Sequence, residues 1–216
     1  MISFAELLRM RNHEAWTRAT THRFVQELGD GTVPDAVLRR YLVQDYAFVT
    51  TLASLVGYGV AKAPTMAGKR LFASFAAALT SEENDYFIRA FDALDVPAAD
   101  REAPTLWPES QSFLTLLREG GEGAWTDILA TLLPAEWIYL DWAEAEAPKA
   151  PPRFEHREWI ALHAAPAFRT FVMTLRAEFD AAADAADAAT RNRMADRFAR
   201  MVRLEGAFFD AAYRAG

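Results

Sequence analysis

The sequence contains no cysteine among its 216 residues. Disulfide bonds, thiolate metal sites and covalent catalysis by sulfur are therefore excluded. Neither a dinucleotide-binding glycine pattern nor a short internal repeat is present. With 52% hydrophobic and 25% charged residues, the chain has enough apolar side chains to bury a large core without covalent crosslinks. We therefore expect one compact domain that covers residues 1–216.

Long apolar runs and basic stretches are also missing. No uninterrupted apolar run is long enough to cross a bilayer, and the first residues carry no basic leader. We expect a cytoplasmic protein without a membrane partner. The formal net charge of -7 and the isoelectric point near 5.2 repel phosphate backbones. Nucleic acid is therefore not an expected partner.

Most of the chain shows the apolar spacing of three and four residues that predicts amphipathic helices. No segment shows the alternation of a β-strand, so the predicted fold class is all-α, most simply a bundle of long helices. Glycine at residues 120–123 and proline between residues 97 and 108 predict breaks. Helices are expected over residues 3–28, 32–60, 65–94, 110–118, 124–145, 154–180 and 191–213, with a shift at residues 165–166.

The stretch of residues 131–142 is the richest in aromatic and small side chains that share a helix face. An alanine next to two large rings leaves a shallow recess that suits a planar ligand, although the same stripe also fits an ordinary core. Pro134 cannot donate to the helix ladder, which predicts a bend beside this face. The face comprises Leu132, Ala135, Tyr139 and Trp142.

Two acids interrupt apolar helix faces. Asp45 is flanked at helical spacing by apolar residues, and Glu205 sits at the centre of the last apolar stripe. A buried charge is costly unless it is paired, so each acid needs either a structural partner or a chemical role. Together with the Tyr139 face, the two acids would form a pocket for a planar base that carries hydrogen-bond donors. One of the side chains of Glu82 and Glu83 is expected to point into the bundle. The spacing does not determine which of the two it is.

The histidines give no sign of a metal site. A di-iron site in a bundle needs a glutamate three residues before a histidine, and none of the histidines has one. A haem held by a single histidine is compatible with the spacing, but a lone helical histidine is more often structural. A Gly-x-Ser-x-Gly motif is absent. No metal and no cofactor are expected. The histidines are His13, His22, His156 and His163.

Several motifs in order along the chain resemble the TenA (thiaminase II-like) family of aminopyrimidine hydrolases. They are Asp-Gly-Thr-Val-Pro at 30–34, Tyr-Leu-Val-Gln-Asp-Tyr at 41–46, Leu133-Pro134 with Trp137 and Tyr139, Arg-Glu-Trp-Ile at 157–160, and Leu204-Glu205 with residues 208–213. The resemblance covers nearly the full length. It implies a bundle of the haem-oxygenase-like type without haem, and a homo-oligomer, usually a tetramer or else a dimer. It also implies a role in thiamine salvage, with a small pyrimidine as the partner molecule.

The resemblance also implies roles for individual residues. Asp45 matches the acid that binds the pyrimidine through hydrogen bonds. Tyr139 matches a tyrosine near the reacting carbon, and Glu205 matches the catalytic glutamate near the leaving amine. His163 corresponds to a tyrosine that is common in the other subgroup, and another pocket aromatic corresponds to Phe48 or Phe113. Where many family members have a nucleophilic cysteine, this chain has Ala135, which places it with a cysteine-free subgroup.

The expected activity is hydrolysis of the C–N bond of 4-amino-5-aminomethyl-2-methylpyrimidine, or of its N-formyl derivative, rather than cleavage of intact thiamine. Glu205 is expected to move protons, and Glu82, Glu83 or Glu136 to substitute for the missing nucleophile. We expect Glu83 as the third catalytic residue with Tyr139 and Glu205. Glu136 ranks last because it lies about 100° from the Ala135 face.

Two alternative functions remain open at this point. A non-catalytic pyrimidine-binding or regulatory protein would keep the pocket without turnover. Cofactor-independent oxidation, as in the bundle related to pyrroloquinoline quinone synthesis, would need a basic, histidine-lined pocket, of which the sequence gives little sign.

Overall fold

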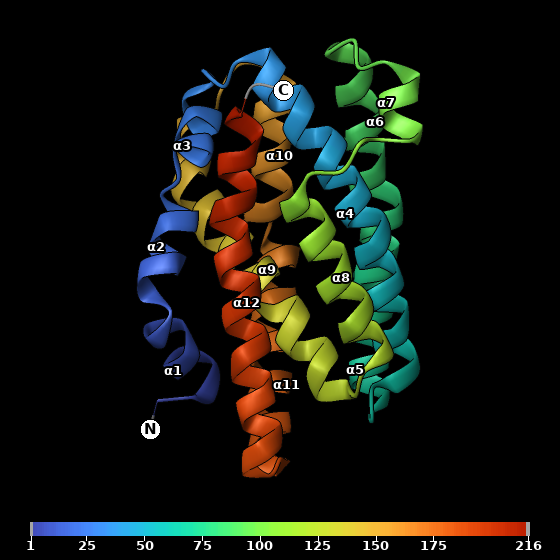
Figure 1. Cartoon of the computed structure of the whole chain (residues 1–216), viewed down its shortest axis with the longest axis vertical. Coiled ribbons are helices and arrows are strands. Elements are labelled where there is room, and N and C mark those ends of the chain that lie inside the picture. The colour runs from blue at the N-terminus through green and yellow to red at the C-terminus, as the bar shows by residue number, and fades with distance from the viewer. Residues whose placement is uncertain (1, 215–216) are drawn as a thin grey trace.

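The structure is a computed structural model that describes residues 2–214. All regular elements in this range are helices, as predicted, and they run largely along one long axis (Figure 1). The elements are α1 (Phe4–Arg11), α2 (His13–Thr20), α3 (Arg23–Asp30), α4 (Asp35–Lys62), α5 (Met66–Ala78), the π-helical turn η1 (Leu79–Glu83), α6 (Asn84–Ala93), α7 (Ala98–Glu102), α8 (Pro108–Glu122), α9 (Trp125–Glu146), the 3₁₀ turn η2 (Ala147–Lys149), α10 (Phe154–Ala164), α11 (Pro166–Ala185) and α12 (Ala188–Tyr213).

Helix α9 is the centre of the bundle. It packs against α8, α10, α11 and α12, and all residues from 128 to 140 are buried. The sequence predicted one buried face, whereas the surrounding helices enclose every face of this helix (Figure 1). A helix that is apolar all round belongs in a protein interior. Pro134 lies inside this helix, one residue before Ala135.

The prediction of a single helix over residues 3–28 was wrong, because polar side chains end and restart the helix twice. The Asn12 side chain donates to the Leu8 carbonyl at 2.8 Å and thereby closes α1. The His22 imidazole accepts from the Phe24 amide at 3.0 Å and begins α3. The resulting short helices α1, α2 and α3 follow one side of the bundle (Figure 1).

The break predicted over residues 120–123 lies at the last of these glycines, because α8 continues to Glu122 and Gly123 separates it from α9. A Cβ atom at Gly120 would lie 2.5 Å from the Thr131 hydroxyl oxygen of α9. The missing Cβ at this glycine therefore allows α8 and α9 to pack closely, and the glycine does not form a turn. The stretch between the helices predicted over residues 65–94 and 110–118, where prolines predicted breaks, contains the short helix α7.

The helix predicted over residues 65–94 contains a π-helical turn at its middle. Helix α5 begins after Thr65, whose hydroxyl accepts from the Gly68 amide at 3.0 Å. The turn η1 then inserts between α5 and α6. Such insertions are frequent at functional sites. Here the turn ends at Glu83, and it turns this side chain toward α9 and α10 while Glu82 stays exposed.

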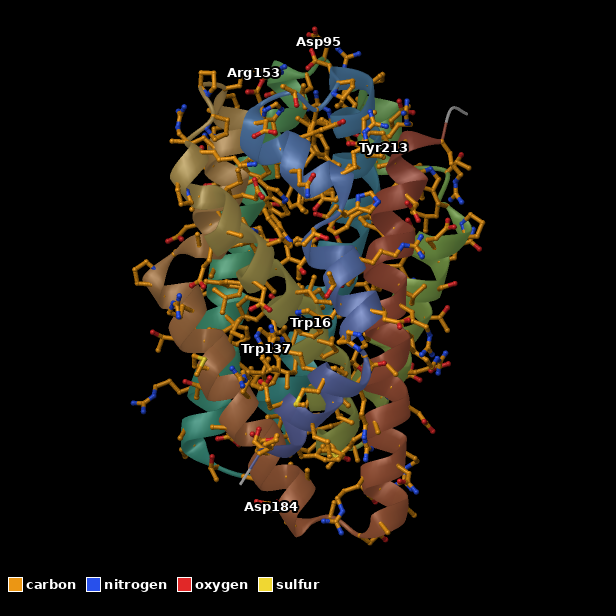
Figure 2. All side chains as sticks on the ribbon, turned by 90° about the vertical axis from the view of Figure 1, so that its left-hand side faces the viewer. Trp16, Asp95, Trp137, Arg153, Asp184 and Tyr213 are labelled. Carbon is orange, nitrogen blue, oxygen red and sulfur yellow. The ribbon has the colours of Figure 1, made fainter. Side chains whose placement is uncertain are left out.

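A tryptophan pair fastens the amino-terminal helices to α9. The rings of Trp16 and Trp137 meet edge to face with centroids 5.0 Å apart, and Figure 2 shows them side by side. The Trp16 indole N–H donates to Asp141 at 2.9 Å, and the Arg176 guanidinium lies 3.7 Å from the centre of a Trp137 ring. Trp137 therefore serves packing between α2, α9 and α11.

We expect two glycines of α4 to respond oppositely to alanine. At buried Gly59 a Cβ would lie 1.9 Å from the Phe72 ring, so Gly59→Ala should lower the free energy of unfolding by about 1–3 kcal/mol. At exposed Gly57 no atom of the described residues, other than the helix's own backbone, lies within 4 Å, so Gly57→Ala should raise it by about 0.5–1 kcal/mol. Urea unfolding of both variants measures the difference. Equal effects would contradict the packing of α4 on α5.

Candidate active site

A small internal cavity lies where α4, η1, α9 and α10 meet. Its volume is about 20 Å³, which is room for about one water molecule. Its wall combines acidic, aromatic and aliphatic side chains, which is the mixture that we expected around Tyr139. The lining residues are Asp45, Phe48, Val49, Leu52, Leu79, Glu83, Ala135, Glu136, Tyr139, Trp159 and His163.

Helix α4 brings Asp45 to this cavity in a buried position. Its side chain is 3% exposed, and its Oδ2 atom has no hydrogen-bond partner among the described residues. Burial raises the pKa of Asp45 to about 7, and the hydroxyl of Tyr41, one turn earlier on the same helix, opposes that shift. An unsatisfied buried carboxyl oxygen is costly. Asp45 is therefore available to a ligand that carries hydrogen-bond donors.

Three glutamates join Asp45 in one acidic cluster. Burial raises the pKa of Glu136 well above its usual range, and the charges of Glu205 and Asp45 add to the shift. Burial and then Asp45 likewise raise the pKa of Glu205. Burial, Glu136 and Asp45 raise that of Glu83, although part of its side chain remains exposed. Carboxyl groups whose pKa values are raised in this way are suited to donate and accept protons.

Glu205 does not line the cavity but lies beside it. It comes from α12, is 2% exposed, and its Oε1 atom lacks a hydrogen-bond partner within residues 2–214. Its charge acts on Glu136 and on Tyr139, which both line the cavity. Helices far apart in the sequence therefore bring the carboxyl groups of Asp45 and Glu205 into one buried region.

A chain of hydrogen bonds holds Tyr139 in place. The Tyr139 and Tyr41 hydroxyls are 2.8 Å apart, and the Trp159 indole N–H donates to the Tyr41 hydroxyl at 3.2 Å. Burial raises the pKa of both tyrosines well above the usual range. Both phenols therefore stay protonated and act as fixed dipoles at neutral pH.

His163 lines the cavity with an uncharged imidazole ring. Its Nδ1 atom lies 2.9 Å from the Trp159 carbonyl oxygen. A carbonyl only accepts, so Nδ1 carries the proton and Nε2 remains an acceptor. Burial lowers the pKa of His163 to about 4. A ligand with hydrogen-bond donors would therefore meet an acceptor at this wall rather than a cation.

The structure brings most of the sequence-predicted site residues together. Ala135 is 2% exposed and lines the cavity, which leaves no nucleophile at that position. Phe113 lies outside the lining, where its ring packs edge to face on Phe48 with centroids 5.2 Å apart. The predicted residues that do line the cavity are Asp45, Phe48, Glu83, Ala135, Tyr139 and His163.

Sequence reasoning overlooked part of the site. Glu136 was ranked last for its angle to Ala135, yet both residues line the cavity, because a glutamate side chain is long enough to reach around the helix. Tyr41 and Trp159 were noted only as parts of motifs. The spacing of Trp159 and His163, four residues apart on α10, is the signal that places both on one face.

Within residues 2–214, no group of three or more histidine, aspartate or glutamate side chains is arranged to hold a metal ion. No helix in that range is both long and apolar enough to span a bilayer.

Comparison with known proteins adds relatives over the whole length. The model of the TENA/THI-4/PQQC family matches residues 9–215. The aminopyrimidine aminohydrolase of Bacillus subtilis is 28% identical over 214 residues, which cover 99% of this chain and 91% of that protein. Its counterpart in Halalkalibacterium halodurans is 25% identical over 216 residues, covering 98% and 96%. A TenA homologue from P. horikoshii superimposes with a TM-score of 0.86 at 22% identity and full coverage of both chains.

Proposed function

The chain belongs to the TENA/THI-4/PQQC family, and from this premise we propose that it is an aminopyrimidine hydrolase of thiamine salvage. Its substrate is 4-amino-5-aminomethyl-2-methylpyrimidine or the N-formyl derivative. The observation that carries the proposal is the acidic cluster, with unsatisfied oxygens on Asp45 and Glu205, around an aromatic cavity. Distant relatives named aminopyrimidine aminohydrolases, at 25% and 28% identity, support the same activity.

Asp45 binds the amidine edge of the pyrimidine in this proposal. The ring nitrogen, once protonated, and the exocyclic amine both donate hydrogen bonds, and the carboxylate accepts them in parallel. The pKa of Asp45 near 7 allows it to exchange its proton with the ring at neutral pH. Phe48 and Tyr139 line the same cavity and provide aromatic contact for the base.

Glu205 acts as general acid and base. A water molecule attacks the methylene carbon and forms the new C–O bond, while the C–N bond breaks and Glu205 protonates the leaving nitrogen. The ionised form of Glu136 or Glu83 takes the proton that the water gives up, and the cluster then returns a proton to Glu205. Because Ala135 offers no nucleophile, water attacks directly and no covalent enzyme intermediate forms.

The cavity must widen to admit the substrate, because a pyrimidine ring is much larger than one water molecule. Phe48 and Glu83 are the lining side chains suited to move, since both are only half-buried. Asp45, Ala135 and Glu136 are held in the interior. We therefore expect the acids of α4 and α9 to stay in place while the side facing η1 opens.

Incubation of the purified protein with 4-amino-5-aminomethyl-2-methylpyrimidine tests the proposal. We expect stoichiometric ammonia and the hydroxymethyl pyrimidine, measured by a coupled ammonia assay and by chromatography. The N-formyl derivative is assayed in parallel. Tight binding without product would instead support a pyrimidine-binding or regulatory protein, and the proposed hydrolase would be wrong.

A further inference from the structure

A second, larger hollow lies directly outside the candidate active site. It is an open groove of about 570 Å³ between α5, η1, α10 and α11. Its wall is mostly apolar, and apart from half-buried Glu83 and buried His163 its polar side chains are exposed. We call it the outer groove. Its main apolar residues are Leu71, Phe75, Leu162, Phe168 and Phe171.

The outer groove and the inner cavity share a wall. Glu83 and His163 line both spaces. Aromatic rings also run from one to the other: Tyr139 and His163 have centroids 4.9 Å apart, and His163 and Phe168 have centroids 5.1 Å apart. Phe75 and Phe171 stack at 3.9 Å on the far side of the groove. A molecule that reaches from one space to the other would pass between Glu83 and His163.

The sizes of the two spaces decide which part of a ligand lies where. The inner cavity holds the unsatisfied carboxyl of Asp45 but has room for about one water molecule, so it must already widen to take a pyrimidine ring alone. The outer groove is the larger space next to this cavity, and it has room for a group attached to the nitrogen at the 5-position. The groove is within the size range of sites that bind small organic molecules.

We propose that the substrates of this protein include aminopyrimidines whose 5-aminomethyl nitrogen carries an apolar, ring-bearing group, and that this group lies in the outer groove. The inference rests on the proposed hydrolase function. Water adds its oxygen to the methylene carbon, the bond from that carbon to nitrogen breaks, and the nitrogen leaves with a proton as a free arylalkyl amine. The other product is the same hydroxymethyl pyrimidine.

The lining explains the preference for an apolar group. Phe75 and Phe171 are buried apart from the small part that faces the groove, and Phe168 is half-buried. A ring laid against them removes apolar surface from water on both sides, and aromatic pairs gain a further small attraction.

The probes are 4-amino-5-aminomethyl-2-methylpyrimidine and its N-benzyl derivative. Their Kd values are measured by calorimetry in a Glu205→Gln background, and their kcat/KM values in the wild type. The benzyl derivative should bind about ten- to a hundredfold more tightly, as expected for burial of one aromatic ring. Ser74→Trp fills the groove from an exposed position on α5 and should remove most of that difference. Ala77→Trp, exposed on the same helix outside the groove, is the matched control and should keep it.

Each outcome separates the two proposals. Equal Kd values for the probes, or a difference that Ser74→Trp leaves intact, would overturn the groove assignment even if the unsubstituted amine is hydrolysed. A groove-dependent difference in Kd without any hydrolysis would keep the groove and overturn the hydrolase. Failure of both probes to bind would overturn both.

Discussion

Glu205→Gln is expected to lower kcat for aminopyrimidine hydrolysis by about a thousandfold, within the range typical for loss of a general acid and base. Glutamine keeps the shape and hydrogen-bonding capacity of the side chain but cannot donate a proton to the leaving nitrogen. Burial and the charge of Asp45 raise the pKa of Glu205, so the wild-type residue holds the proton that the reaction needs. KM should change little, because the lost interaction belongs to the transition state.

The matched control for this variant is Glu155→Gln. Glu155 is also buried, but it pairs with Arg153 at 3.0 Å and lies outside the cavity lining. It should keep kcat within about twofold, as expected for a site away from the reacting atoms. Thermal melting and circular dichroism show whether each variant is folded. A folded Glu205→Gln protein with wild-type kcat would remove Glu205 from the mechanism.

Local patterns in the sequence predicted the all-α bundle and most helix ends. Periodic apolar residues determine where a long helix such as α12 or α4 runs, and the prediction came within a few residues of the observed ends. The amino-terminal segment failed because the side-chain bonds of Asn12 and His22 to the backbone are not visible in apolar spacing. The end of α8 was predicted at residue 118 instead of Glu122, because a glycine that ends a helix and one that permits close packing, such as Gly120, look alike in a sequence.

In the candidate site, too, the sequence predicted some residues and missed others. Interrupted apolar faces identified Asp45 and Glu205 as buried acids, and both are buried. The choice between Glu82 and Glu83 depends on the π-helical turn η1, which no spacing rule predicts. The place of Glu136 depends on how far its side chain reaches, which a helix angle does not measure. Contacts between helices, such as that of Tyr41 with Tyr139, arise only in the folded chain.

Asp45→Asn is expected to raise the Kd for the aminopyrimidine by about a hundredfold. The wild-type carboxylate accepts charge-assisted hydrogen bonds from the ring nitrogen and the exocyclic amine, each worth about 1.5–3 kcal/mol. An asparagine accepts through its oxygen but turns an N–H₂ donor toward one of the two ligand donors. Asp35→Asn, on the exposed first turn of the same helix, is the control and should leave Kd unchanged.

The same substitution should also change how stability depends on pH. Burial raises the pKa of Asp45 from 3.8 to about 7, so the folded protein binds this proton more tightly than the unfolded chain. The stability that Asp45 contributes is therefore complete below its unfolded pKa and is lost as pH rises through about 7. Between those values the free energy of unfolding of the wild type should fall relative to Asp45→Asn by about 1.4 kcal/mol per pH unit. Urea unfolding of both proteins at mildly acidic and neutral pH measures this slope. Parallel curves would mean that Asp45 is ionised in the folded protein throughout, and such a group would be paired with a cation rather than free to take up a ligand.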